Sequence, residues 1–151
     1  GLIILRAYTK MYAVPGVRFG WCMTADAALI EKLYHAGQPW NVSVIAQACA
    51  AAAANEPDWA AETAKRIAEE RKFLSDGLAA CGLTVFPGEA NFLLFRSNDT
   101  GLHEKLAEHG IMIRNCDNYR GLSAGYYRVA VKTREASKCL LNAIKLIIEN
   151  G

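Results

Sequence analysis

An amine and a guanidinium lie eight residues apart near the start of the chain, at Lys10 and Arg18. A lysine that follows a buried strand has a fixed position, and partial desolvation would let its amine act as a nucleophile and form a Schiff base. Arg18 lies between Val17 and Phe19, where a charge without a partner is costly, and its planar guanidinium suits a phosphate. These residue types therefore fit a phosphate-bearing cofactor. The residues alone leave two alternatives open, a solvated Lys10 and a structural ion pair at Arg18.

Three residues in the second half of the chain could bind an anionic substrate. Arg128 lies inside the apolar run 126–131, where it needs an anionic partner unless it faces solvent at a sheet edge. Arg114 comes directly after a short apolar run, and its alternative interpretation is a surface charge. Asn91 precedes Phe92 and could equally be a turn residue at the start of a strand.

The composition argues against several other kinds of site. The chain has 151 residues, 52% hydrophobic and 21% charged, which is ordinary for a soluble globular protein of one domain or one and a half. A net charge of +2 gives no reason to expect nucleic acid or a membrane as partner, and no apolar run reaches the roughly 18 residues of a membrane span. The five cysteines and three histidines show no metal-ligand spacing, so we expect no metal. The odd number of cysteines favours reduced thiols in the cytoplasm.

The elements that must position Lys10 and Arg18 come first along the chain. Residues 2–6 and 17–23 read as two buried strands of the kind found in a parallel sheet covered on both faces, with a loop between them. Helices are predicted over 26–35 and 44–54, and the alanine-rich composition of the second helix favours burial.

The second half changes character after a long amphipathic helix predicted over 59–81, in which Arg71 is the single polar member of the apolar stripe. Strands are predicted at 83–86, 91–95, 111–113 and 126–131, and helices over 100–109 and from a Thr133 cap to Gly151. The pattern predicts an α/β chain, with a sheet-and-helix part followed by a small unit of four strands and two covering helices.

The order Thr9, Lys10, Gly16, Arg18, Gly20 resembles the lysine segment of fold-type I pyridoxal-phosphate enzymes in the class I/II aminotransferase family. The resemblance implies pyridoxal 5'-phosphate as cofactor, with Lys10 attached to it and moving protons at the substrate's α-carbon, and with Arg18 binding its phosphate. Many relatives have a hydroxyl residue three positions before the lysine, where this chain has alanine, so that contact is absent.

The resemblance extends to the residues that would hold the substrate. In this family an arginine of the C-terminal strand grips the substrate's α-carboxylate, and Arg128 matches it. Residues 113–122 resemble the threonine-phosphate decarboxylases and, somewhat less, the histidinol-phosphate aminotransferases. In both groups the arginine equivalent to Arg114 helps hold the substrate's phosphate, and Asn91 matches a position near the substrate.

The fold implied by the resemblance is a remnant of the aminotransferase large-domain sheet plus a small C-terminal α/β domain, joined by a long helix. Residues 1–58 would be the C-terminal part of the cofactor-binding large domain, and residues 59–151 the helix and small domain. The resemblance does not cover the family's N-terminal half. We therefore expect this piece to be inactive alone, and the full-length enzyme to be a homodimer.

The sequence thus predicts the C-terminal portion of an enzyme acting on a phosphorylated amino acid or amine, most like a threonine-phosphate decarboxylase. Transamination of histidinol phosphate and a broader aspartate or aromatic aminotransferase are the alternatives. An alternative of another class is a non-catalytic α/β interaction domain, in which Arg18, Arg114 and Arg128 would form structural pairs.

Overall fold

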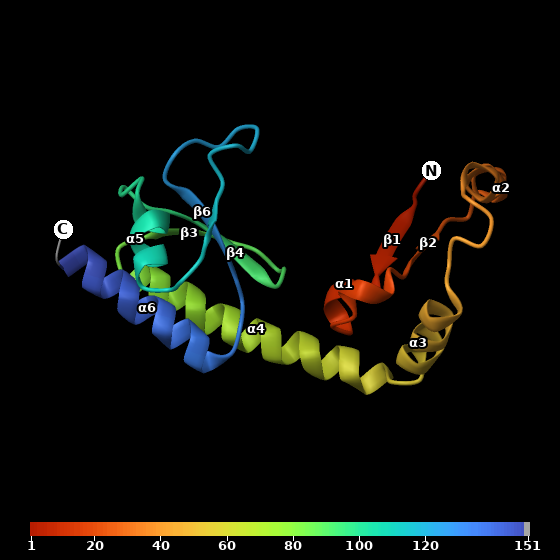
Figure 1. Ribbon diagram of the computed structural model, residues 1–151, viewed down its shortest axis with the longest axis horizontal. Helices are drawn as coiled ribbons and strands as arrows, with labels where there is room; N and C mark the ends of the chain where they lie inside the picture. The colour runs from red at the N-terminus through yellow and green to blue at the C-terminus, as the bar shows by residue number, and fades with distance from the viewer. Residues whose placement is uncertain (150–151) are drawn as a thin grey trace. The chain divides into compact units, whose positions relative to one another are not determined.

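The computed structural model describes residues 1–149, which form helices and antiparallel strands (Figure 1). The predicted α/β class is confirmed. The chain separates into two compact units, Gly1–Thr63 and Ala64–Gly151. Helix α4 (Pro57–Ala80) contributes residues to both. The assignment of residues 1–58 to a cofactor-binding domain and of 59–151 to a helix and small domain stays a prediction, as does the helix end at Gly151, which lies outside the described residues.

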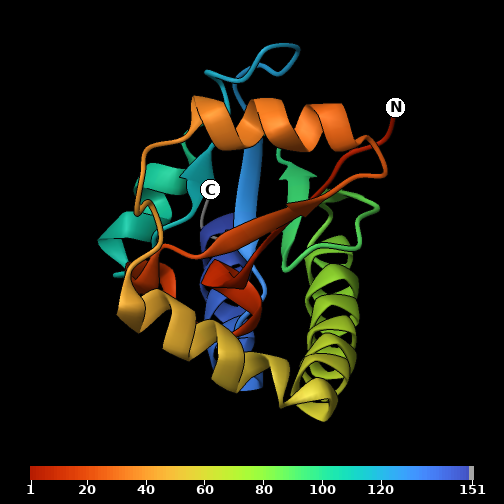
Figure 2. The same ribbon diagram turned by 90° about the vertical axis from the view of Figure 1, so that its right-hand side faces the viewer.

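The first unit contains an antiparallel pair of strands, β1 (Ile4–Ala7) and β2 (Gly20–Met23), drawn side by side in Figure 2. The connection between them holds the short helix α1 (Tyr8–Met11) and the 3₁₀ helix η1 (Pro15–Val17). Two helices follow, α2 (Ala27–Ala36) and α3 (Val44–Ala54). Each begins at a side-chain cap, because Asp26 accepts from the Leu29 N–H and Ser43 from the Ala46 N–H.

The first unit differs from the sequence prediction in burial and in strand direction. Both strands are exposed along their length and pair antiparallel, whereas the apolar runs suggested buried parallel strands. Helix α3 is also largely exposed, with Val44 81% exposed and Ala46 alone buried among its described residues. The physical reason is that no element described in the first unit covers β1 and β2, so their apolar side chains stay exposed. The second strand begins later than predicted because η1 occupies Pro15–Val17.

The second unit is built on an antiparallel sheet of order β3-β4-β6-β5, within the residues that the structure describes. Its strands are β3 (Thr84–Phe86), β4 (Phe92–Arg96), β5 (Arg114–Asn115) and β6 (Tyr126–Ala130), and its other helices are α5 (Leu102–Glu108) and α6 (Arg134–Glu149). The expected strand at 111–113 is wrong. The Ile111 N–H donates to the Leu106 carbonyl at 2.9 Å to close α5, so pairing with β6 starts only at Arg114.

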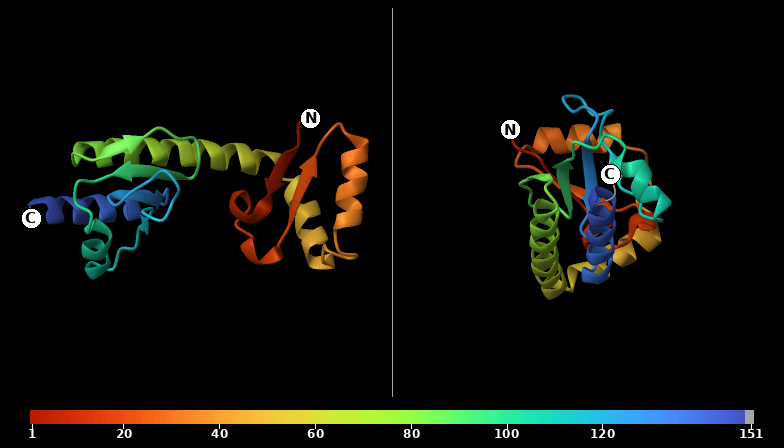
Figure 3. Two further views of the ribbon diagram at one scale, coloured as in Figure 1. Left: turned by 90° about the horizontal axis from the view of Figure 1, so that it is seen from above. Right: turned by 90° about the vertical axis from the view of Figure 1, so that its left-hand side faces the viewer.

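The core of this unit lies between the sheet and the helices α4 and α6, which run side by side (Figures 1 and 3). Alternate residues of the central strands, Leu93, Phe95 and Tyr127, point into it and are at most 3% exposed. The helices approach closely at Gly77, where a Cβ atom would collide with the side chain of Leu141. Because strand side chains alternate, the neighbours of these residues in sequence must lie on the opposite, open face of the sheet.

Candidate active site

Lys10 and Arg18 both lie on the connection between β1 and β2. Lys10 is an exposed residue of α1, a single helical turn that starts where β1 ends. The turn is held against the far end of the connection, because the Tyr8 N–H donates to the Phe19 carbonyl at 3.2 Å. The Tyr8 ring also packs on Phe19, with 5.0 Å between ring centroids. One compact element therefore fixes both candidate residues.

Arg18 occupies the left-handed backbone region at φ 57°, directly after η1. Its Nη1 donates to the Pro15 carbonyl at 3.0 Å, and within residues 1–149 its guanidinium makes no ion pair. Gly20 then faces Ala7 across the hairpin, where a Cβ atom would lie 2.8 Å from the Arg6 carbonyl oxygen. Glycine is therefore required for the close approach of the two strands that brings the connection together.

Lys10 and Arg18 have the chemistry that a phosphate-bearing carbonyl cofactor needs. The amine of Lys10 is accessible, and the guanidinium of Arg18 has donors left over after its single backbone contact. In the part of the chain that the structure describes, neither group is neutralised by a carboxylate. The pair therefore fits a phosphate-bearing group, and the structural ion pair considered for Arg18 is absent from residues 1–149.

Arg114 and Arg128 are direct partners across β5 and β6, so their side chains lie on the same face of the sheet. This is the open face, opposite the buried Tyr127. The Arg128 guanidinium lies 5.0 Å from the centre of the Phe92 ring, and that of Arg114 lies 5.7 Å from the Tyr119 ring. Aromatic faces attract cations, so these rings hold the two guanidinium groups without neutralising them.

Two like charges directly opposite each other on a sheet destabilise it unless an anion lies between or beside them. Within residues 1–149 neither arginine takes part in an ion pair, and Arg114 adds only a 3.3 Å hydrogen bond from Nη2 to Asn118. The two arginines also act on the buried Cys116. Burial raises the pKa of its thiol, and the positive charges of Arg128 and Arg114 partly offset that rise. The arrangement is suited to binding an anionic group.

Asn91 immediately precedes β4, which is a central strand of the same sheet. Its carbonyl accepts the Val131 N–H at 2.9 Å, which continues the pairing of β4 with β6 by one step. The residue is exposed, and its side-chain amide makes no hydrogen bond to the described residues. The structure thus brings Arg114 and Arg128 together on one face of the sheet, leaves Asn91 at the start of β4 without a hydrogen bond to either, and places Lys10 and Arg18 on one hairpin.

Sequence reasoning missed the aromatic supports Phe92 and Tyr119. The alternation of β4 carried a signal for Phe92, because Leu93 and Phe95 read as core and Phe92 must then share the face of Arg128. Tyr119 lies in an irregular loop, and periodicity gave no signal for it. No group of histidine, cysteine and carboxylate residues suited to a metal occurs among residues 1–149, and no helix described there is long and apolar enough to cross a membrane.

Comparison with known proteins places this geometry in a family. A sequence model described as aminotransferase class I and II matches residues 1–144. The threonine-phosphate decarboxylase of Salmonella typhimurium is 34% identical over 148 residues, which cover 96% of this chain and 41% of that protein. The histidinol-phosphate aminotransferase 2 of Archaeoglobus fulgidus is 33% identical over 147 residues, which cover 97% and 42%. The chain therefore spans about two fifths of the length of these curated relatives.

Solved structures agree with the sequence relatives. The histidinol-phosphate aminotransferase from Clostridium acetobutylicum superposes with a TM-score of 0.93 at 32% identity, covering 99% of this chain and 46% of that one. The L-threonine-O-3-phosphate decarboxylase from Porphyromonas gingivalis shares the fold, with a TM-score of 0.85 at 22% identity over 98% of this chain and 47% of that one. The histidinol-phosphate aminotransferase from Sinorhizobium meliloti, with a TM-score of 0.79 at 23% identity over 98% and 41%, was solved with pyridoxal-5'-phosphate. This chain belongs to the class I and II aminotransferase family of pyridoxal-phosphate enzymes.

Proposed function

We propose that this chain is the C-terminal part of an enzyme that acts on a phosphorylated amino acid or amine, and that its reaction is the decarboxylation of threonine phosphate. The observation that carries the proposal is the facing pair of Arg114 and Arg128 on the open face of the sheet, with no carboxylate partner in residues 1–149. A substrate with a carboxylate and a phosphate brings two anionic groups, which matches two adjacent cations. The full-length enzyme is proposed to be a cytoplasmic homodimer without nucleic-acid or membrane partners.

Lys10 and Arg18 are the residues proposed to hold pyridoxal phosphate. The Lys10 amine is the point of covalent attachment, and the Arg18 guanidinium binds the phosphate through the donors that its contact with Pro15 leaves over. When bound, pyridoxal phosphate supplies an electron sink for negative charge at the substrate's α-carbon.

The chain's own residues then orient the substrate and move its protons. Arg128 binds the α-carboxylate with two parallel N–H donors, and its position over the Phe92 ring fixes the plane of the guanidinium. Arg114 binds the phosphate, and Asn91 contacts the substrate from the neighbouring strand end. The Lys10 amine would hold a proton and move it to or from the substrate's α-carbon.

Cofactor attachment has a direct test in the full-length enzyme. Borohydride treatment of the yellow holoenzyme should fix the cofactor to the peptide that contains Lys10, and Lys10→Ala should abolish the fixation. A colourless protein, or fixation at another lysine, would contradict the assignment. Arg128→Lys keeps the charge but loses the planar fork, so it should raise KM about tenfold or more while leaving the colour unchanged.

The reaction type needs a product assay, because both candidate substrates carry a phosphate that Arg114 could bind, although only O-phosphothreonine also carries a carboxylate. The enzyme would be given O-phosphothreonine alone, and in parallel histidinol phosphate with 2-oxoglutarate. Carbon dioxide from the first substrate would support decarboxylation. Glutamate from the second would instead make the protein a histidinol-phosphate aminotransferase, the second candidate, which the 33% identity to the Archaeoglobus fulgidus relative favours.

A further inference from the structure

Arg71 is a polar residue on the buried side of α4, and the active-site roles proposed above do not use it. Its side chain is 13% exposed, although it lies on a stripe that otherwise faces the core. A guanidinium in such a place must satisfy several donors.

The contacts of Arg71 converge on the loop between β3 and β4. Nη1 donates to the carbonyl of Glu89 at 3.0 Å and to that of Ala90 at 3.2 Å. Nη2 lies 2.9 Å from the Glu89 carboxylate, which is 96% exposed. An exposed ion pair contributes little, so the two backbone carbonyls are the contacts that matter for the path of the chain.

These two carbonyls belong to the last two residues before Asn91. The loop contains no helix or strand from Pro87 to Asn91, so its course is not fixed by regular backbone pairing. On the other side, the Asn91 carbonyl is held by the Val131 N–H at 2.9 Å. The backbone at Asn91 is therefore fixed on both sides. Arg71 holds the two residues that precede it, and the Val131 N–H, which follows β6, holds its own carbonyl.

We propose that Arg71 is a positioning residue for Asn91. By donating hydrogen bonds to the carbonyls of Glu89 and Ala90, Arg71 fixes the position of the Asn91 side-chain amide relative to the substrate. The role rests on the proposed function, in which Asn91 contacts the substrate. Arg71 itself touches neither cofactor nor reacting atoms, so its effect must pass through Asn91.

The test uses the full-length holoenzyme and two readouts, steady-state kinetics with the phosphorylated substrate and amide hydrogen exchange at Val131. Arg71→Met should raise KM about tenfold with little change in kcat, because it displaces a binding group without removing one that acts only in the transition state. Arg71→Lys, which keeps the charge and can reach a carbonyl, should restore part of the loss. In an Asn91→Ala background, Arg71→Met should have little further effect on KM.

Two matched controls separate this role from general stability. Glu89→Ala removes only the exposed carboxylate and should leave KM unchanged. Lys72→Met removes a cation from the next position of α4, where Lys72 pairs with Asp76 at 2.8 Å, and should also leave KM unchanged.

The hydrogen-exchange readout does not depend on the proposed substrate. Val131 donates to the Asn91 carbonyl, so its amide should exchange faster in Arg71→Met than in Lys72→Met. Unchanged exchange at Val131, or additive effects of Arg71→Met and Asn91→Ala on KM, would overturn the inference. An enzyme inactive on both phosphorylated substrates would overturn the proposed function instead, while faster exchange at Val131 would still support the role of Arg71 in fixing the loop.

Discussion

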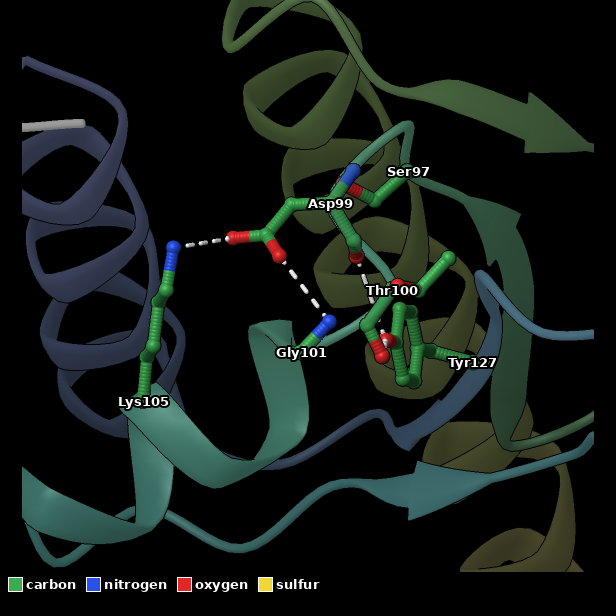
Figure 4. Close-up of polar contacts among 6 residues, drawn as sticks. All are labelled: Ser97, Asp99, Thr100, Gly101, Lys105 and Tyr127. Atoms are coloured by element: carbon green, nitrogen blue, oxygen red, sulfur yellow. Dashed lines mark hydrogen bonds and ion pairs between the residues drawn. The ribbon is translucent and has the colours of Figure 1, made fainter.

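The buried hydroxyl of Tyr127 offers a sharp test of the second unit. The Tyr127 side chain is fully buried on β6, and its hydroxyl donates to the Thr100 carbonyl at 2.7 Å (Figure 4). The Asp99 carbonyl lies 3.2 Å from the same hydroxyl. Tyr127→Phe keeps the ring, and so preserves its packing against Phe95, while it deletes the hydrogen bond. The substitution therefore measures the contribution of the hydrogen bond that joins β6 to the loop between β4 and α5.

The size of the effect follows from what is left behind. Deletion of one buried hydrogen bond, with a carbonyl left short of a donor, costs about 1–2 kcal/mol. That cost corresponds to a roughly 5- to 30-fold change in the equilibrium between closed and open forms. Burial also raises the pKa of Tyr127, so its contribution to stability is present below the ordinary tyrosine pKa of about 10 and is lost as pH rises through the raised value.

Native-state hydrogen exchange of the β4 and β6 amides measures this free energy within the second unit. The matched control is Tyr126→Phe, one residue earlier on the opposite face, whose hydroxyl makes no hydrogen bond to the described residues. Tyr127→Phe should speed exchange of these amides roughly 5- to 30-fold. Tyr126→Phe should change their exchange by less than about twofold. Equal effects of the two substitutions would refute the reasoning.

Close contacts and partly exposed charges elsewhere in the chain can be tested by single substitutions. Gly77→Val should destabilise the second unit by about 2 kcal/mol, since the new side chain collides with Leu141, and denaturant unfolding checks this. The hydrogen bond from Lys105 lowers the pKa of Asp99, so Asp99 stabilises the fold above its ordinary pKa of about 4 and this contribution is lost as pH falls through the lowered value. The stability difference between wild type and Asp99→Asn should therefore shrink in acid titrations. Gly20→Ala should reduce cofactor loading, measured by absorbance, because it forces β1 and β2 apart.

The sequence predicted the second unit better than the first. Periodicity located α4, β4 and β6 to within a few residues, because each of them buries one face against the core of the same unit. In the first unit the apolar run at residues 2–6 indicated a strand, which the structure places at Ile4–Ala7, but its exposure and antiparallel partner could not be read from composition. An apolar run indicates that a segment is favoured in a buried position. It does not indicate which part of the protein covers the segment.

The candidate site was predicted by residue type and order more than by geometry. Spacing singled out Lys10 and Arg18, and the structure places them on one hairpin connection. The facing of Arg114 and Arg128 depends on strand register, which a run of apolar residues around each arginine does not encode. The contact of Arg71 with the loop joins residues 18 positions apart, and its partners are backbone carbonyls, which no side-chain motif reveals.

The alternation of β6 has a consequence for how the protein avoids misfolding. Tyr127 points into the core and Arg128 to the open face, so a shift of the strand by one residue would exchange them. The shifted strand would carry a guanidinium into an apolar interior, at a cost of several kcal/mol, and would strand a tyrosine ring in water. The alternation of Tyr127 and Arg128 therefore disfavours the shifted register relative to the observed one. A chain that acquires the stable register has, by the same step, placed Arg128 on the open face opposite Arg114.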